Sequence, residues 1–373
     1  MKILFISQHY FPVIGGIEIY IKEVARLLKK KGNEVHVISS LSDKNRKLES
    51  FEGVKIHRLA PKKNFVHRLT SFEGMEEEIK KISPDIIQFC YHGNLFFYDA
   101  AKIAKKLSIP YFVLSFGPIN VSEASNLKSL VQDNLFDALL TPFIYKNAKM
   151  VFYRIPDNKS WCERKGSLKN IYLPSGITKD FFVKPDLSLK NKLFKKKKVV
   201  LFAGRVCEDK GVRILVEAFN EVKAKIKDAD LVLFGRRDED FVKSLQLDKN
   251  IKIMGPVPFG KEKELVKVID TSDVLVLPSK HEGFGQVLAQ AMARGKPVVA
   301  TKVGAIPSWV SSKNGFLVDY GDVNALANSI IKLLSNKSLS AKLGSYNRGY
   351  ARKFLIDSQI KILEGEYKKC LKK

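Results

Sequence analysis

The chain has few cysteines and no long apolar run. Its cysteines, Cys90, Cys162, Cys207 and Cys370, include no CxxC pair, so neither a disulfide framework nor a zinc knuckle is indicated. No apolar stretch approaches the roughly 18 residues that a membrane-spanning helix needs. The opening MKILFISQHYF has an apolar run shorter than the roughly 7 to 15 residues of a secretory signal, and it predicts a buried strand instead. We therefore expect a reduced, cytoplasmic protein.

Two further absences exclude classes of function. No GxGxxG motif follows a predicted strand, which argues against a dinucleotide-dependent oxidoreductase. Acidic residues are scarce, because 65 Lys and Arg residues stand against 39 Asp and Glu residues, for a net charge of +26. This charge favours anionic partners such as phosphorylated substrates or an acidic membrane surface. The basic residues are spread through both halves without an aromatic and basic motif, so nucleic acid is not expected as a partner.

The same order of predicted elements opens each half of the 373-residue chain. KILFISQ predicts a strand, GIEIYIKEVARLLKKKG repeats apolar residues at helical spacing, and NEVHVISS predicts the next strand. From residue 198 the order recurs as KVVLFAG, the amphipathic VRILVEAFNEVKAKI and ADLVLFG. Further strands are expected at DIIQF, YFVLS, MVFYR, IYLPS, IKIMG, DVLVLPS and PVVAT. The pattern predicts an α/β protein with two parallel-sheet domains.

The domain boundaries are set by a change in composition. Residues 184–198, KPDLSLKNKLFKKKK, are polar and lysine-rich and are expected to form a linker with a solvated surface. Residues 1–183 then form the first domain and residues 199–350 the second. Residues 351–373 predict a basic helix with no strand after it, which is expected to pack back across a domain.

Two loops that follow predicted strands are candidate ligand sites, because ligands of open parallel sheets bind beyond the carboxyl ends of the strands. After DVLVLPS, the glycines at 283 and 285 allow close approach of the backbone, and Glu282 can reach hydroxyl groups of a ligand. An acid ahead of a helix is also a common cap, so both interpretations stand. After KVVLFAG, Arg205 and Lys210 share one loop and can neutralise a diphosphate, although surface cations are common in so basic a chain.

These segments resemble those of a known family. GRVCEDKGVRILVEAF resembles the GR…KG segment of the retaining glycosyltransferases with the GT-B architecture, family 4 in particular. PSKHEGFGQVLAQAMARGKPVVAT is similar to that family's EGFG stretch, with its E-x7-E spacing and its EAMA.G.PVV run. FPVIGGIEIYIKEVARLLKKKGNEVHVIS resembles the amino-terminal GG segment, and IYLPSGITKDFF the PNG(V/I)D…F turn. The matches run in family order to about residue 330. The resemblance implies two facing Rossmann-like domains, with a C-terminal helix that crosses back to the first.

The resemblance also implies an activity and the residues for it. A sugar would move, with retention and without a metal or cofactor, from a nucleotide-diphosphate sugar to a hydroxyl of a glycan or lipid-linked acceptor. A UDP-sugar is favoured as the donor and a GDP-sugar is next. Arg205 and Lys210 would stabilise the leaving diphosphate, and Glu282 would bind the donor sugar. Further donor-binding positions would be Gly15, Gly16, Gly235, Arg236, Pro256, Val257, Gly283, Phe284, Gly285, Val287, Leu288 and Gln290.

The chain departs from the family pattern at several positions. Gln290 replaces a glutamate that binds the ribose, and an amide keeps one carbonyl acceptor but loses the charge. Phe116 replaces a histidine near the reacting sugar, so His92 becomes the nearest candidate, although a lone loop histidine is more often structural. Ala305 and Ser308 replace a glycine and a glutamate. Two alternatives therefore stay open: a nucleotide-sugar epimerase of the same architecture, and a catalytically reduced nucleotide-sugar-binding protein.

Residues 122–148 mix apolar and polar side chains. A helix here could rest on the cytoplasmic face of a membrane beside a lipid-linked acceptor, helped by the positive charge. Alternatively, its apolar face packs on the sheet of the first domain. The apolar residues in question are Leu130, Leu135, Phe136, Leu139, Leu140, Phe143 and Ile144.

Overall fold

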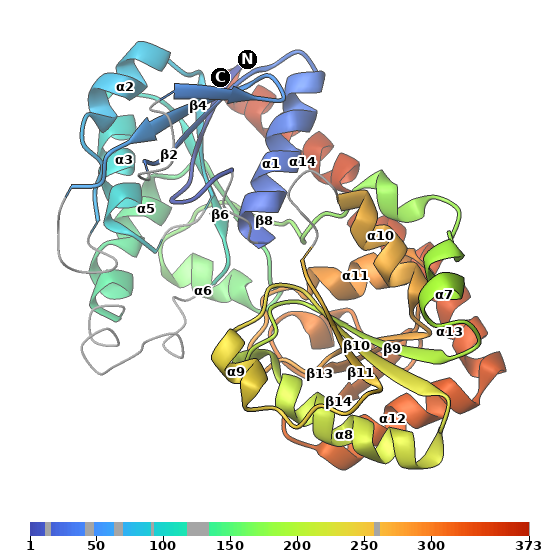
Figure 1. Cartoon of the computed structure of the whole chain (residues 1–373). Coiled ribbons are helices and arrows are strands. Elements are labelled where there is room, and N and C mark those ends of the chain that lie inside the picture. Colours follow the sequence, from blue (N-terminus) through green and yellow to red (C-terminus); the bar gives the residue numbers. More distant parts are fainter. Residues whose placement is uncertain are drawn as a thin grey trace. The chain divides into compact units, whose positions relative to one another are not determined.

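A computed structural model describes residues 1–11, 16–41, 48–62, 70–90, 93–117, 134–256 and 262–372. The chain divides into two compact units: unit 1 comprises residues 1–175 with 357–373, and unit 2 comprises residues 176–356. Each unit has its own sheet with helices on both faces (Figure 1). The predicted α/β class with two parallel sheets is confirmed.

Within the described residues, unit 1 has an eight-stranded sheet of order β3-β4-β2-β1-β5-β6-β7-β8. All neighbouring strands are parallel except β3 and β4. The strands are β1 (Lys2–Ile6), β2 (Glu34–Ser40), β3 (Leu48–Phe51), β4 (Val54–Leu59), β5 (Ile86–Phe89), β6 (Tyr111–Ser115), β7 (Met150–Tyr153) and β8 (Asn170–Tyr172). The helices are α1 (Gly16–Lys30), α2 (Met75–Ile82), α3 (Leu95–Lys106), α5 (Thr141–Asn147), α6 (Asn158–Arg164) and α14 (Ile356–Leu371).

Helices cover both faces of the unit 1 sheet (Figure 1). The helices α2, α3 and α5 lie on one face, and α1 and α14 on the other. Helix α1 buries Ile21, Val24 and Leu28, which recur at the spacing of one helical face. In α14, the buried Tyr367 donates a hydrogen bond from its hydroxyl to Gln88 Oε1 at 2.7 Å. The C-terminal helix therefore returns to the first sheet, as predicted.

Unit 2 has a parallel sheet of order β11-β10-β9-β12-β13-β14. The strands are β9 (Lys198–Ala203), β10 (Ala229–Phe234), β11 (Ile251–Met254), β12 (Val274–Leu277), β13 (Val298–Thr301) and β14 (Gly315–Val318). The helices are α7 (Ser188–Leu193), α8 (Val212–Lys225), α9 (Glu239–Lys243), α10 (Glu262–Thr271), α11 (Gln286–Ala293), α12 (Val323–Ser335) and α13 (Lys337–Tyr350). The short 3₁₀ helices are η2 (Lys179–Phe182), η3 (Glu208–Lys210), η4 (Ile306–Ser308) and η5 (Ala351–Phe354). The chain adds strands outward from β9 in one direction and from β12 in the other, so the sheet order reverses between these two neighbours.

The segment expected to be a linker is instead part of unit 2. Residues 188–193 form α7, and Lys190 Nζ lies 2.6 Å from Asp273 Oδ1, which neutralises one of the lysines. Phe194 is 2% exposed, so the segment also buries apolar surface. The change of unit falls after Ser175, ahead of the expected boundary at residue 183. The prediction of a linker considered only the composition of the segment, which does not reveal the ion pair of Lys190 or the burial of Phe194.

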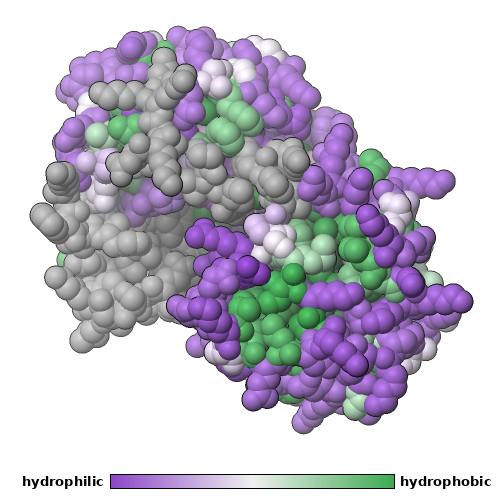
Figure 2. All heavy atoms as spheres, viewed as in Figure 1, coloured by the Kyte–Doolittle hydropathy of each residue, from purple (hydrophilic) through white to green (hydrophobic). Residues whose placement is uncertain are grey.

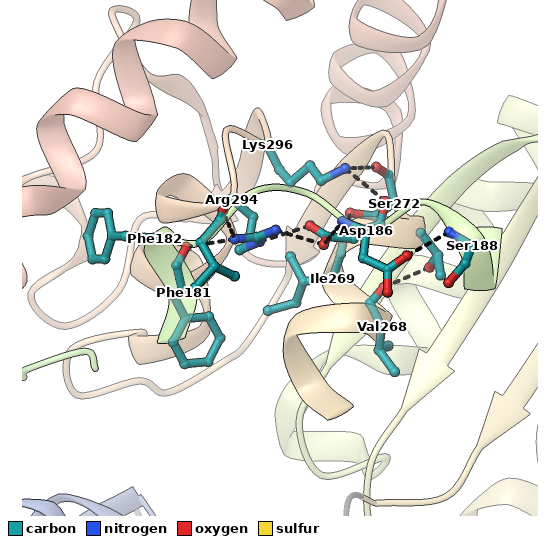
Figure 3. Close-up of polar contacts among 12 residues, drawn as sticks. Phe181, Phe182, Asp186, Ser188, Val268, Ile269, Ser272, Arg294 and Lys296 are labelled. Atoms are coloured by element: carbon teal, nitrogen blue, oxygen red, sulfur yellow. Dashed lines mark hydrogen bonds and ion pairs between the residues drawn. The ribbon is translucent and has the colours of Figure 1, made fainter. Parts of the chain in front are cut away.

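A buried ion pair ties residues 181–186 to the body of unit 2 (Figure 3). Arg294 is 3% exposed, and its Nε and Nη2 donate to the two carboxylate oxygens of Asp270 at 2.8 and 2.7 Å. Its Nη1 donates to the carbonyl oxygens of Phe181 and Val183. Asp270 also accepts a hydrogen bond from the backbone N–H of Asp186. One carboxylate and one guanidinium therefore fix the start of unit 2.

The visible surface is mostly hydrophilic, with an apolar area on unit 2 (Figure 2). No helix among the described residues is long and apolar enough to cross a membrane. In the described part of residues 122–148, Phe136 and Ile144 are buried, whereas Leu135 and Leu139 are 56% and 63% exposed. The apolar positions are therefore divided between the core and the surface, and residues 122–133 lie outside the described ranges.

Candidate functional site

The candidate site in unit 2 lies where the loops after β9 and β12 meet. These strands are neighbours at the reversal of strand order, the place where open α/β sheets bind ligands. Gly211 has a φ of +67°, and a Cβ atom there would lie 2.0 Å from the carbonyl oxygen of Pro278. The backbone N–H of Lys280 donates to the carbonyl oxygen of Asp209 at 3.0 Å. Only glycine at position 211 therefore allows the two loops to pack this closely.

The approach of the two loops brings Lys210 and Glu282 together. Lys210 Nζ lies 2.7 Å from Glu282 Oε2, and the side chains are 18% and 19% exposed. Ser279 Oγ donates to the same oxygen at 3.3 Å. Helix α11 begins after Gly285 without a side-chain cap, so Glu282 does not cap it. The structure thus argues against the capping interpretation of Glu282, and its role in a site stays a prediction.

Arg205 occupies the same loop as Lys210 but is exposed. No hydrogen bond or ion pair joins its side chain to another described residue. The neighbouring loop after β10 packs against it, since Val206 N donates to the carbonyl oxygen of Arg236 at 2.8 Å. A Cβ atom on Gly235 would lie 2.0 Å from the carbonyl oxygen of Gly204, so this contact also requires glycine. Arg205, Gly235 and Arg236 therefore lie on adjoining loops.

At the amino end of α11, backbone groups rather than side chains are the candidates for binding a ligand. Gly283 is exposed and Gly285 has a φ of +74°. Phe284 is 6% exposed and stacks on Trp309 with ring centroids 5.0 Å apart, and Leu288 is fully buried. The Phe284 and Leu288 side chains therefore belong to the core, and Val287 is half-buried. The free N–H groups of a helix amino end suit an anion such as a phosphate.

Gln290 is half-buried on α11, and its side-chain amide makes no hydrogen bond within the described residues. Sequence reasoning missed two other residues of this region, Ser279 and Gly304. A Cβ atom on Gly304 would lie 1.7 Å from the carbonyl oxygen of Glu282, and Ala305 N donates to the carbonyl oxygen of Gly283 at 2.8 Å. The available signal was that VGAIPS follows the strand next to β12.

The structure describes only some of the remaining predicted site residues. Gly15, His92 and Val257 lie outside the described residues. Gly16 is exposed at the first position of α1 in unit 1, and Pro256 is exposed after β11. Among the residues that the structure describes, no group of three or more His, Cys, Asp or Glu side chains is placed to hold a metal ion.

Comparisons with known proteins match both halves of the chain to glycosyltransferases. A model of the glycosyl transferases group 1 matches residues 197–336, and a model of Glycosyltransferase Family 4 matches residues 14–151. An uncharacterized glycosyltransferase of Methanocaldococcus jannaschii is 27% identical over 365 residues, 95% of this chain and 94% of that protein. The N-acetyl-alpha-D-glucosaminyl L-malate synthase of Bacillus anthracis is 24% identical over 353 residues, 91% of this chain and 89% of that one.

Among solved structures, HepE of Anabaena in complex with UDP-glucose matches with a TM-score of 0.76 and 18% identity over 98% of each chain. This likeness confirms the predicted GT-B fold.

Proposed function

Since the chain belongs to the glycosyltransferases of group 1 and family 4, we propose which substrates it uses and how its residues act on them. The donor is a nucleotide-diphosphate sugar, with UDP favoured as the nucleotide and GDP next. The acceptor is a hydroxyl of a glycan or a lipid-linked sugar. Transfer retains the anomeric configuration and requires no metal. The observation that supports this proposal best is the cluster of Arg205, Lys210 and Glu282 at the strand-order reversal of unit 2.

In this proposal Arg205 and Lys210 stabilise the departing diphosphate. Arg205 is exposed without a partner in the described residues, so its guanidinium is available to phosphate oxygens. Preorganised charge at the position where charge develops is usually the largest contribution to catalysis. The amides of Gly285, Val287 and neighbouring residues at the amino end of α11 add hydrogen-bond donors on the same side of the sheet.

Glu282 positions the donor sugar. Its Oε2 accepts from Lys210 and Ser279, while no described residue donates to Oε1. One carboxylate oxygen is therefore held in place and the other is available to a sugar hydroxyl. The ion pair also fixes Lys210 on the phosphate side of that sugar. A single contact thus orients both a sugar-binding and a phosphate-binding group.

The remaining predicted positions complete the donor site in the proposal. The loops with Gly235 and Arg236, and with Pro256 and Val257, flank the nucleobase, and Gln290 faces the ribose. HepE of Anabaena was solved with UDP-glucose, which supports UDP as the first nucleotide to test. From unit 1, Gly15 and Gly16 would approach the phosphates. His92 is the candidate side chain near the reacting sugar.

The location proposed for the enzyme is the cytoplasm, with contact to the cytoplasmic face of a membrane. Exposed Leu135 and Leu139, together with the net charge of +26, support binding to an anionic surface. Sedimentation with anionic vesicles in moderate salt tests this. A protein that stays in the supernatant would contradict it.

The donor proposal is tested with a panel of UDP-, GDP- and ADP-sugars. At least one should raise the melting temperature of the wild type, and R205A/K210A should lose that response. The matched control K249A/K337A removes two exposed lysines of the same unit and should keep it. If no donor stabilises the fold, the donor site is misassigned.

The reaction is tested by product analysis. A transferase releases nucleotide mainly when an acceptor is added, an epimerase converts the donor alone, and a protein that only binds does neither. Nucleotide release should therefore depend on added acceptor. Conversion of the donor sugar without acceptor would favour the epimerase instead.

A further inference from the structure

A buried arginine lies at the carboxyl edge of the sheet in unit 1. Arg154 is the first residue after β7 and is 1% exposed. Its backbone N–H donates to the carbonyl oxygen of Ser115, the last residue of the neighbouring β6, at 3.1 Å. The side chain therefore starts from the edge of the sheet at which α/β proteins bind their ligands.

The guanidinium of Arg154 is only partly paired. Its Nη1 donates to Ser175 Oγ at 2.8 Å, whereas its buried Nε and Nη2 make no hydrogen bond of normal geometry in the described part of the chain. The hydroxyl of Tyr20 lies close enough to the guanidinium to interact with its charge. The guanidinium carbon atom lies 3.7 Å from the ring centroid of Tyr20 and 5.3 Å from that of Phe116. No described carboxylate forms an ion pair with it. Burial lowers the pKa of Arg154, which reflects the cost of a charge in these surroundings.

Two other arginines show what the unpaired edge of Arg154 is suited to bind. Arg294 uses Nε and Nη2 to hold the carboxylate of Asp270 at 2.8 and 2.7 Å. Arg26 uses the same two atoms to hold Glu23 Oε2 at 3.1 and 2.6 Å. In Arg154 these are the atoms without a partner. A guanidinium stays charged in proteins, and buried charges are as a rule paired, so the unpaired edge calls for an anion.

We propose that the Nε and Nη2 edge of Arg154 binds an oxyanion, a carboxylate or a phosphate group, on the acceptor substrate. The planar fork matches both groups bidentately. The buried hydroxyl of Tyr20 interacts with the guanidinium and makes no hydrogen bond of normal geometry within the described residues, so its proton is available to the same anion. The assignment to the acceptor rests on the proposed transferase function, whereas the oxyanion site does not.

An anion reaches Arg154 only if a covering side chain moves. Of the two rings beside the guanidinium, Tyr20 is buried and Phe116 is half-buried. Phe116 is therefore the ring that rearranges at lower cost. Exclusion of water by these rings strengthens the interaction once the anion is bound.

The test uses the full chain with R205A/K210A as background, so that phosphate cannot bind at the donor site. Inorganic phosphate and succinate are titrated separately while the melting temperature and the binding heat are followed. At least one of them should raise the melting temperature, because a ligand of the folded state stabilises it. Adding Arg154→Met should weaken that binding at least about tenfold, since two charged hydrogen bonds are lost. A stronger response to phosphate or to succinate identifies the anion.

Two further variants separate binding from folding. The control Arg164→Met removes an exposed arginine of α6 and should leave anion binding unchanged. Tyr20→Phe keeps the ring over Arg154 and should weaken anion binding several-fold without a loss of stability. In the otherwise wild-type chain, Arg154→Met should keep its affinity for UDP, which separates this site from the donor site. Absence of any response to both anions, or an equal response with Arg154→Met, would overturn the proposal.

Discussion

Arg154 in unit 1 and Arg294 in unit 2 are buried to a similar extent, 1% and 3% exposed, yet among the described residues only Arg294 forms an ion pair with an acid. Arg294 holds Asp270 with both atoms of its fork and adds two backbone carbonyls. In the described part of the chain, Arg154 contacts one serine hydroxyl and two aromatic rings. A paired buried arginine is part of the scaffold, whereas an unpaired one at a ligand-binding edge leaves its charge for a ligand.

The same contrast distinguishes the basic residues of the proposed donor site. Arg205 is exposed to solvent, so its charge costs little before a ligand binds, and Lys210 is held by Glu282. Unit 2 thus exposes the cation Arg205 at the carboxyl edge of its sheet, whereas unit 1 buries the cation Arg154 at the carboxyl edge of its own sheet. We therefore expect anionic ligands to bind quickly and in a salt-sensitive way at the exposed cation of unit 2, and more selectively at the buried cation of unit 1.

The largest expected effect is that of breaking the Arg294 pair. Arg294→Met leaves the Asp270 carboxylate buried and uncompensated, which should destabilise the fold by about 3–5 kcal/mol. Urea denaturation measures this effect. Arg154→Met leaves no such orphaned acid in the described residues and should be neutral or stabilising in a buffer without oxyanions. Equal losses for the two variants would contradict the comparison.

The double variant R294M/D270L sharpens this result. Replacing both partners of a buried pair with apolar side chains is often neutral or stabilising. The double variant should therefore recover most of the stability that Arg294→Met loses. Failure to recover would mean that the hydrogen bonds to Phe181 and Val183, rather than the ion pair, maintain the fold.

The second largest effect is expected at Glu282. Glu282→Gln removes the negative charge that pairs with Lys210 and replaces one of the two carboxylate acceptors by an amide nitrogen. If Glu282 binds the donor sugar as proposed, transfer should fall roughly 10- to 150-fold, the value of one charged hydrogen bond. Steady-state rates at saturating donor measure this effect. Ser279→Ala removes a neighbouring hydroxyl and should cost much less. Unchanged transfer in Glu282→Gln would show that this carboxylate has no part in the reaction.

A smaller effect is expected at Gln290. If position 290 faces the ribose as proposed, Gln290→Glu should preserve or tighten UDP binding by a few-fold, since charged hydrogen bonds are stronger than neutral ones. Calorimetric titration of UDP into both proteins measures this. Loss of affinity on introducing the acid would mean that the roles of positions 282 and 290 are interchanged.

A further effect, on the pH dependence of stability, concerns Lys296, which donates from Nζ to the carbonyl oxygens of Asp270 and Ser272 (Figure 3). Burial lowers the pKa of Lys296 from 10.5 to about 8. Below pH 8 the charged amine is present in both the folded and the unfolded chain. As the pH rises from 8 towards 10.5, only the unfolded chain keeps the proton, so the contribution of Lys296 to stability rises. Relative to Lys296→Met, wild-type stability should increase across this window in urea titrations.

Much of the fold could be predicted from the sequence, because the buried strands of a parallel sheet are short apolar runs. The strands β3, β4 and β14 were not predicted. In β4 the polar His57 and Arg58 are buried, because His57 pairs with Glu78 and Arg58 with Glu49. Polar residues normally indicate an exposed segment, so β4 did not look like a buried strand. The preceding turn needs positive φ at Glu52 and Gly53, and Glu52 gives no such signal.

The site was predicted less completely. Spacing alone placed Arg205 and Lys210 on one loop and Glu282 on another. Their meeting depends on Gly211 passing close to Pro278, a contact between segments more than sixty residues apart that no local pattern encodes. Arg154 gave no signal, because a single arginine after a strand is an ordinary event in so basic a chain. Arg154 is a candidate site residue only because the described structure places no carboxylate beside it.

The proposed donor site is tested most directly by calorimetric titration of UDP into three full-length proteins. The wild type and the control K249A/K337A should bind with similar affinity. R205A/K210A should bind at least about 100-fold more weakly, because two charged hydrogen bonds to the diphosphate are lost. Equal affinity for UDP in all three proteins would contradict the donor site at the reversal of strand order in unit 2.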